Sequence, residues 1–169
     1  MANNRVIGVI PARWGSTRFP GKSLAPICGK PLIHWVIQRC LKARRLDSLL
    51  VATDDRRIAD AVKGTGVQAV MTRPGHPSGT DRIAEAVGGT KADVVINIQG
   101  DEPLIDPRLI DRLAREMLLN RGWDMATAAA PLVNRNELDS PSVVKVVWDD
   151  RGQALYFSRS VIPFLRDGD

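Results

Sequence analysis

The chain has 169 residues, of which 44% are hydrophobic and 25% charged, and its formal net charge at pH 7 is +5. These values are typical of one globular domain with a substantial core. No apolar run approaches the roughly 18 residues of a membrane span, and the first residues lack the hydrophobic core of a signal peptide. We therefore expect a cytoplasmic protein with no membrane partner.

The positive charge is concentrated in the N-terminal third. Residues 1–50 contain nine Lys and Arg side chains and one acidic side chain, Asp47. Such a surplus suits nucleic acid or a small polyanion. With three Phe, four Trp and one Tyr that do not alternate with the basic residues, no nucleic-acid partner is expected, and a phosphorylated small molecule fits better. Cys28 and Cys40 fit no metal or redox spacing and are expected to be reduced bystanders.

The chain begins with a predicted strand and a cationic loop. Residues 6–10 are an apolar, β-branched run, which predicts a buried parallel strand that the following proline ends. The loop after it is rich in Gly and Pro and contains Arg13, Arg18 and Lys22. A cationic, glycine-bearing loop after the first strand is where open α/β sheets hold phosphates. A plain solvated basic loop is the alternative.

Strands and helices then alternate. The further expected strands are 48–53, 67–71 and 93–99, and the expected helices are 31–45, one that Asp54-Asp55 caps and Gly64 closes, one from Thr80 as its cap to Val87, and 107–119 with Asp106 as its cap. Four strand-then-helix repeats predict an α/β, Rossmann-like, mostly parallel sheet flanked by helices.

The pattern changes after about residue 124. Residues 125–132 and 143–148 read as strands, and 149–152 as a hairpin turn into a strand at 154–157, so we expect mixed or antiparallel additions there. The last residues follow an apolar stretch at 161–165, and we expect the polypeptide to continue beyond them. We therefore expect a single domain over 1–169, with a nucleotide-binding half at 1–123 and an incomplete part at 124–169.

Two nucleotide motifs are rejected. Gly21-Lys22-Ser23 matches the end of a P-loop, but its first glycine would fall at position 16, which is Ser16. Pro20 would also remove one of the backbone N–H groups that such a loop presents to phosphate. The G-x-G-x-x-G fingerprint is absent, which argues against a nicotinamide or flavin enzyme.

Two other segments carry chemistry. Asp101 follows the fourth strand, where a carboxylate near a triphosphate needs Mg²⁺ between them, and it is free of a capping role because Asp106 caps the next helix. In the loop at 72–82, Arg73, Ser78 and Arg82 offer hydrogen-bond donors, and the backbone of residues 78–80 could face a pyrimidine. His76, in the same loop, has no evident partner that would make it a base and is as well explained as a surface residue.

Five segments together resemble one family. IPARWGSTRFPGKSLAPICGKPLI, MTRPGHPSGTDRIAEA, NIQGDEPLI, VVKVV and ALYFSR are similar, in order and spacing, to the motifs of the 3-deoxy-manno-octulosonate cytidylyltransferases, the CMP-Kdo synthetases. The resemblance runs from about residue 7 to 162. The related CMP-sialate synthetases share such an opening but differ at residues 16–22.

The resemblance implies that CTP activates Kdo to CMP-Kdo with release of pyrophosphate, for lipopolysaccharide biosynthesis, with Mg²⁺ as cofactor and a homodimer for the complete protein. It implies catalytic roles for Arg13, Lys22 and Asp101, with Asp101 as the metal ligand. The implied nucleotide-binding residues are Pro11, Ala12, Arg13, Ser16, Lys22, Arg73, Ser78, Gly79, Arg82 and Gln99, and the implied sugar-acid-binding residues are Ser158 and Arg159.

Members of this family are longer, and the additional part completes the metal and sugar-acid sites. If residues 1–169 were the whole protein, we would expect weakened CTP binding and little turnover; with the remainder present we expect a normal enzyme. The alternatives are a CMP-sialate-type synthetase, a glycosyltransferase that uses a sugar nucleotide as donor, and a truncated CTP-binding module without turnover.

Overall fold

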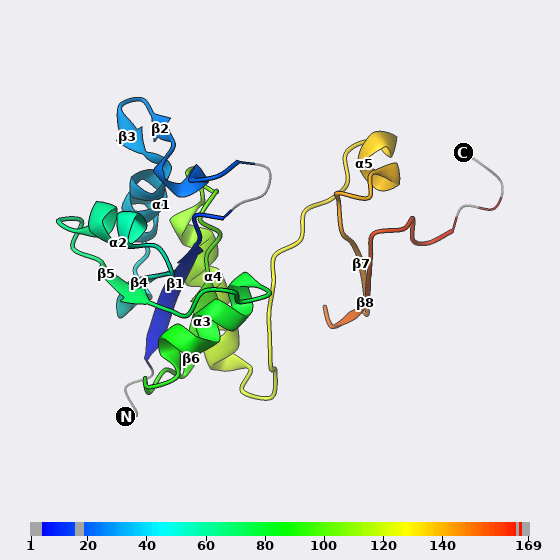
Figure 1. Cartoon of the computed structure of the whole chain (residues 1–169). Coiled ribbons are helices and arrows are strands. Elements are labelled where there is room, and N and C mark those ends of the chain that lie inside the picture. The colour runs from blue at the N-terminus through cyan, green and yellow to red at the C-terminus, as the bar shows by residue number, and fades with distance from the viewer. Residues whose placement is uncertain (1–4, 16–18, 165, 167–169) are drawn as a thin grey trace. The chain divides into compact units, whose positions relative to one another are not determined.

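The structure, a computed structural model, describes residues 5–15, 19–164 and 166. It divides into two compact units, Met1–Ala126 and Thr127–Asp169, and each is described here by itself. Figure 1 labels their helices and strands.

The first unit is built on a four-stranded parallel sheet in the order β5-β4-β1-β6. The strands are β1 (Val6–Ala12), β4 (Ser48–Thr53), β5 (Gln68–Met71) and β6 (Val94–Asn97). The helices are α1 (Leu32–Cys40), α2 (Arg56–Val62), α3 (Gly79–Val87) and α4 (Pro107–Leu119). This arrangement confirms the predicted Rossmann-like class.

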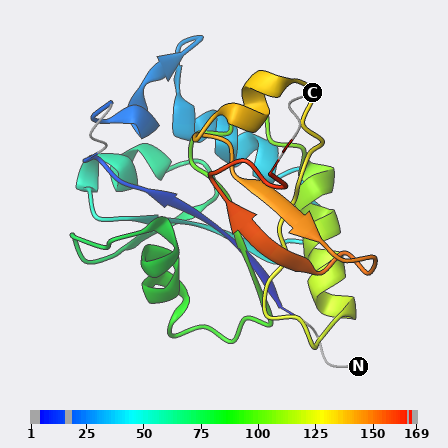
Figure 2. The same cartoon turned by 90° about the vertical axis from the view of Figure 1, so that its right-hand side faces the viewer.

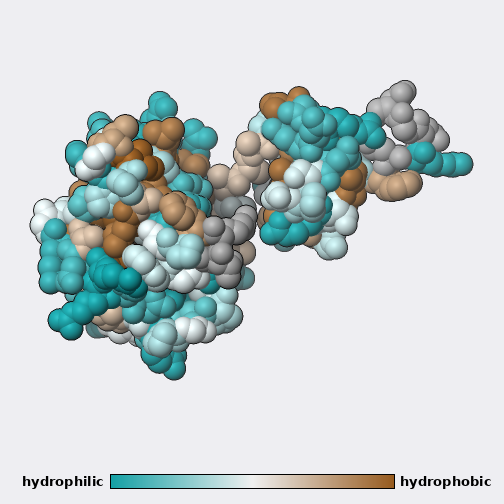
Figure 3. Space-filling model, turned by 45° about the horizontal axis from the view of Figure 1, so that its top comes forward, coloured by the Kyte–Doolittle hydropathy of each residue, from teal (hydrophilic) through white to brown (hydrophobic). Residues whose placement is uncertain are grey.

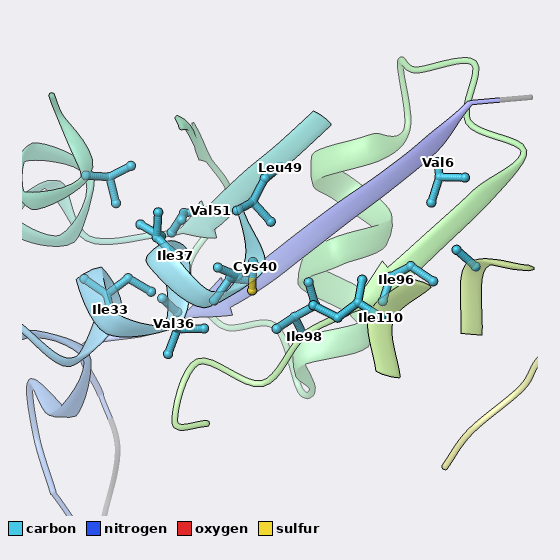
Figure 4. Close-up of a cluster of buried hydrophobic side chains, with 14 of the residues drawn as sticks. Val6, Ile33, Val36, Ile37, Cys40, Leu49, Val51, Ile96, Ile98 and Ile110 are labelled. Atoms are coloured by element: carbon cyan, nitrogen blue, oxygen red, sulfur yellow. The ribbon is translucent and has the colours of Figure 1, made fainter. Parts of the chain in front are cut away.

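Helices cover both faces of the sheet. The larger buried cluster joins one face of the strands to apolar side chains of α1, α2 and α4. Ile58 represents α2 in this cluster, and Ile33 and Ile110, labelled in Figure 4, represent α1 and α4. A smaller cluster joins the other face to Ile83 of α3. Because both faces are covered, the central strand β1 is an almost continuous apolar run, as a buried parallel strand requires.

A short insertion links β1 to α1. It consists of the 3-10 helix η1 (Lys22–Leu24) and the small antiparallel hairpin β2 (Pro26–Ile27) and β3 (Lys30–Pro31). The Trp35 indole N–H on α1 donates to the backbone carbonyl of Ile27 at 2.9 Å, which holds this hairpin against the helix. The sequence pattern did not predict these three elements.

Two predicted ends in the first part of the chain are wrong. Pro11 does not end the first strand, which continues to Ala12 along β4; the pairing with β6 stops at Val9, so the missing N–H of Pro11 is tolerated. Helix α1 ends at Cys40 rather than near Arg45. The backbone N–H groups of residues 44 and 45 instead donate to the carboxylate of Asp111 on α4, both at 2.8 Å.

Two further predictions need correction. The cap of α3 is Ser78 rather than Thr80, because the Ser78 hydroxyl accepts from the backbone N–H of Asp81 at 3.1 Å. Residues 125–132 form no strand. No other described segment pairs with them, and an extended segment without a partner has no ladder of hydrogen bonds to hold it.

The second unit contains the antiparallel hairpin of β7 (Lys145–Trp148) and β8 (Ala154–Ser158), preceded by the short helix α5 (Arg135–Asp139). The hairpin, orange to red in Figure 2, confirms the antiparallel addition and its turn at 149–152. Brown, apolar residues lie at the surface of this small unit (Figure 3). Over the described part of the chain, none of the helices has the length and apolarity needed to cross a membrane.

Candidate nucleotide site

Three elements of the first unit converge at the carboxyl end of β1. A Cβ atom built on Gly79, at the start of α3, would lie 3.2 Å from the Pro11 ring, and one built on Gly100, after β6, would lie 3.1 Å from the Pro11 carbonyl. A side chain at either position would require its neighbour to move by a few tenths of an ångström. The first turn of α3 and the loop after β6 therefore pack directly on the end of the central strand, as the topology of a parallel sheet predicts.

A pocket of about 200 Å³ opens at this meeting point. Its lining includes most of the residues that the sequence assigned to nucleotide binding; these are Pro11, Ala12, Arg13, Ser78, Gly79, Arg82 and Gln99. A larger cavity, of about 360 Å³, lies near the amino ends of β4 and β5. Among the described residues that line it there is no Lys or Arg, so the smaller pocket is the better candidate for an anionic ligand.

The pocket lining, as far as the structure describes it, does not include the other three assigned residues, Ser16, Lys22 and Arg73. Ser16 is outside the described residues, and Arg73 does not line the pocket. Arg13 is exposed, and its guanidinium forms no hydrogen bond or ion pair with any part of the chain that the structure describes. It is therefore available to a ligand.

Lys22 and Asp101 meet although 79 positions separate them in the chain. The Lys22 Nζ atom lies 2.6 Å from Asp101 Oδ2, with 41% of the lysine side chain and 49% of the aspartate side chain exposed. The positive loop after β1 and the carboxylate after β6 thus converge, as the sequence predicted. Because both groups are half exposed, the pair itself adds little stability, and each is accessible to a ligand.

The loop that carries Lys22 is closed at a neck, where the backbones of Trp14 and Gly21 meet. The backbone N–H of Gly21 donates to the Trp14 carbonyl at 2.9 Å, which closes the loop between Arg13 and Lys22. Gly21 has φ +71° and packs against the Trp14 ring. The same ring stacks on the Arg57 guanidinium, whose central carbon is 3.3 Å from the ring centroid.

Asp101 is held by a sequence of turns. The backbone N–H of Glu102 donates to the Gln99 carbonyl, and that of Ile105 donates to the Glu102 carbonyl. Arg39 on α1 donates through Nε to the Ile105 carbonyl at 2.9 Å. Asp106 caps α4, as predicted, which leaves the Asp101 carboxylate outside the helix terminus.

The donor set at Asp101 suits a magnesium ion that substrate oxygens help to bind. Mg²⁺ is commonly held by one or two carboxylates together with phosphate oxygens and water. No group of three or more His, Cys, Asp or Glu side chains suited to a metal occurs in the described parts of the chain. A single accessible carboxylate therefore fits Mg²⁺ that arrives with a nucleotide better than a metal bound by protein alone.

Arg82 and residues 76–78, just before α3, form one side of the pocket, the α3 wall. Arg82 is 3% exposed and donates to the Thr72 hydroxyl and, at 2.8 Å, to the Asp54 carboxylate. It therefore ties the ends of β4 and β5 to α3 while it lines the pocket. His76 is not a plain surface residue, because its side chain is only 10% exposed and its ring pairs with the Glu85 carboxylate on α3.

The two residues assigned to the sugar acid, Ser158 and Arg159, lie at the end of β8 in the second unit. The Arg159 guanidinium donates to the Pro141 carbonyl at 2.7 Å, and the Ser158 hydroxyl accepts from the backbone N–H of Ser160 at 2.9 Å. Lys145 is 4% exposed and donates to three backbone carbonyls, including that of Arg159 at 2.6 Å. The role of Arg159 and Ser158 stays a prediction.

Residues 7–169 match the family model described as "Cytidylyltransferase". The chain belongs to the cytidylyltransferase family. It is 49% identical over 163 residues to a 3-deoxy-manno-octulosonate cytidylyltransferase of Trichlorobacter lovleyi, covering 96% of this chain and 65% of the relative. It is 52% identical over 167 residues to an 8-amino-3,8-dideoxy-manno-octulosonate cytidylyltransferase of Shewanella frigidimarina, covering 96% of this chain and 68% of the relative.

The fold agrees with this family membership. A solved structure of CMP:2-keto-3-deoxy-manno-octonic acid synthetase complexed with CTP superposes with a TM-score of 0.86 at 44% identity, over 97% of this chain and 68% of that one. The chain thus spans about two thirds of the length of these relatives. The resemblance predicted from the sequence is confirmed.

Proposed function

We propose that this protein transfers CMP from CTP to a 3-deoxy-octulosonate and releases pyrophosphate. The observation that carries the proposal is the contact between Lys22 and Asp101, two residues after the pocket-lining Gln99, because it combines a cation suited to phosphate with a carboxylate suited to a metal. The family membership and the CTP complex of a relative support the choice of nucleotide.

In the proposed reaction the anomeric hydroxyl oxygen of the sugar acid attacks the α-phosphorus of CTP. The bond from that phosphorus to the bridging oxygen of the β-phosphate breaks, pyrophosphate leaves, and the proton of the attacking hydroxyl passes to solvent water. Lys22 would exchange its bond to Asp101 for triphosphate oxygens, and Arg13 would bind the same group from the other end of the loop. Both cations would stabilise the charge that develops on the leaving group.

Asp101, freed from Lys22, would hold Mg²⁺, which would supply positive charge to offset that of the phosphate groups. The buried hydrogen-bond network of Arg82, Thr72 and Asp54 would keep the α3 wall rigid, so that the base and ribose are held in one orientation. Residues 127–169 would contribute to the sugar-acid site, with Arg159 suited to the carboxylate of that acid.

The sugar acid is either 3-deoxy-manno-octulosonate or its 8-amino-3,8-dideoxy analogue, since relatives of both names are about 50% identical to this chain. We favour the first, in line with the resemblance of the motifs. The deciding assay measures kcat/KM for pyrophosphate release with each acid at saturating CTP. A higher value for the 8-amino acid would reverse this choice.

The function itself is tested by pyrophosphate release from CTP, Mg²⁺ and the sugar acid. Lys22→Ala should lower kcat/KM by about 30- to 1,000-fold, the effect of losing one contact to developing charge, on the order of 2–4 kcal/mol. Asp101→Asn should abolish Mg²⁺-dependent turnover. The matched controls are K63A and D60N, which break a 2.6 Å lysine–aspartate pair at the carboxyl end of α2 and should leave turnover unchanged. CTP binding without product would instead identify a nucleotide-binding module.

We further infer that the complete enzyme is a cytoplasmic homodimer that serves lipopolysaccharide biosynthesis. The basis for these three statements is the resemblance to the synthetase family, and the supply of CTP agrees with a cytoplasmic site. Light scattering on the complete protein tests the dimer, and a single-chain mass at concentrations where the enzyme is active would contradict it.

A further inference from the structure

The wall of the pocket between β5 and α3 has little regular structure of its own. Residues 72–78 contain two prolines and no helix or strand, and most of them are exposed. At its start the segment is tied by the backbone N–H of Thr72, which donates to the Thr53 carbonyl at 2.8 Å, and at its end Ser78 caps α3. His76, Pro77 and Ser78 nevertheless line the pocket.

Between these two ends, the segment donates hydrogen bonds to the carboxylate of Glu85. Glu85 accepts from the backbone N–H of Arg73 at 3.0 Å, from Arg73 Nε at 3.3 Å and from the His76 ring. Its side chain is 28% exposed and that of His76 only 10%. On α3, Glu85 lies three residues after Arg82 and seven after Ser78, which places it on the helix face that lines the pocket, one turn further along.

The ionised form of Glu85 is the one that this arrangement needs. Burial acts to raise the pKa of the carboxyl, but the hydrogen bonds from the Arg73 backbone, the His76 ring and the Arg73 side chain outweigh it, and the pKa is lowered. A carboxylate accepts at both oxygens, whereas an amide presents a donor at one of them. A glutamine at position 85 would therefore direct an N–H group toward the Arg73 and His76 groups, which themselves donate hydrogen bonds.

We propose that Glu85 is a positioning residue for the nucleotide pocket: through His76 and Arg73 it fixes the wall against which the nucleoside part of CTP packs. The inference rests on the proposed function, and it gives Arg73 a different role from the predicted one. The Arg73 side chain is 80% exposed and outside the pocket lining, so its part is to anchor the wall rather than to contact the nucleotide.

The test is equilibrium binding of CTP with Mg²⁺ by calorimetry, together with steady-state kinetics. E85Q should raise the Kd and the KM for CTP about five- to thirtyfold, the effect of losing one or two charge-assisted hydrogen bonds, while kcat and the KM for the sugar acid stay within twofold. R73A keeps the backbone N–H bond and should change the Kd less than E85Q does. E116Q, which removes a helix carboxylate on α4, is the matched control and should bind CTP as the unaltered protein does.

A merely structural role would lower the melting temperature and affect all kinetic constants alike, which would overturn the inference. If E85Q fails to fold, H76Q tests the same wall without a change on α3 and should weaken CTP binding similarly. CTP affinities equal to that of the unaltered protein in both variants would overturn this inference alone. Absence of CTP binding by the unaltered protein would overturn the proposed function, and this inference with it.

Discussion

Gly21 stands where the loop between Arg13 and Lys22 closes, and its replacement by alanine tests whether the neck of this loop sets the position of Lys22. The residue has φ +71°, a conformation that costs a non-glycine residue about 1 kcal/mol. An added Cβ would also lie 2.8 Å and 2.9 Å from two carbons of the Trp14 ring. Since Arg57 stacks on that ring, a shift of the indole would disturb a second contact.

Overpacking of this kind typically costs about 1–3 kcal/mol, so Gly21→Ala should lower the free energy of unfolding by about 2–4 kcal/mol. Gly64→Ala is the matched control, because Gly64 has φ +80° and no heavy atom within 4 Å of the added Cβ. It should lose only the conformational part, about 1 kcal/mol. Urea unfolding followed by far-UV circular dichroism gives both values.

The kinetic consequence of the same change can be measured separately. Gly21→Ala should raise the KM for CTP, because Lys22 follows the displaced residue, whereas Gly64→Ala should leave it unchanged. Equal losses of stability in the two variants would show that the Trp14 contact carries no strain, and an unchanged KM would show that the neck does not position the lysine.

Three smaller predictions concern stability and accessibility. Ellman's reagent should modify one thiol of the native protein, that of exposed Cys28. Cys40 should react only after unfolding, since it is 0% exposed and burial raises its pKa to about 12. Two reactive thiols per native molecule would contradict this. Hydrogen bonds from arginine side chains lower the pKa values of the cap residues Asp55 and Asp106, so the unfolded state binds more protons in acid. The urea midpoint of unfolding should therefore fall as the pH drops below about 4 toward the folded-state pKa values. A midpoint that does not change with pH in this range would refute the contribution of these two carboxylates. Lys145→Met leaves three backbone carbonyls without their donor, so amide exchange in β7 and β8 should become faster. Unchanged protection of the hairpin would contradict this prediction.

The sequence predicted those elements whose signals are local. The bounds of β4 and α4 match the prediction, because an apolar run between turn residues and an Asp-Pro cap define them within a few residues. The turn at 149–152 was equally readable. The wrong strand at 125–132 shows the limit of this reasoning, since a strand needs a pairing partner and composition does not provide one.

The candidate site was predictable where topology alone brings residues together. Lys22 and Asp101 each follow a parallel strand, and the carboxyl ends of neighbouring strands meet at one edge of the sheet. The pairing of His76 with Glu85 was not predictable, because it depends on how a proline-rich loop folds back on the next helix. The stacking of Trp14 on Arg57 likewise joins two loops whose approach no local pattern encodes.

The central claim is that Lys22 and Asp101 act on one nucleotide through a shared divalent ion. Mn²⁺ in place of Mg²⁺, bound together with CTP, broadens NMR signals of nearby nuclei, so lysine side chains labelled with ¹³C report their distance from the metal. The account predicts that the Lys22 signal broadens on addition of Mn²⁺ and CTP, that Lys91, before the amino end of β6, stays sharp, and that the broadening is lost in Asp101→Asn. A Lys22 signal that stays sharp while CTP binds would contradict it.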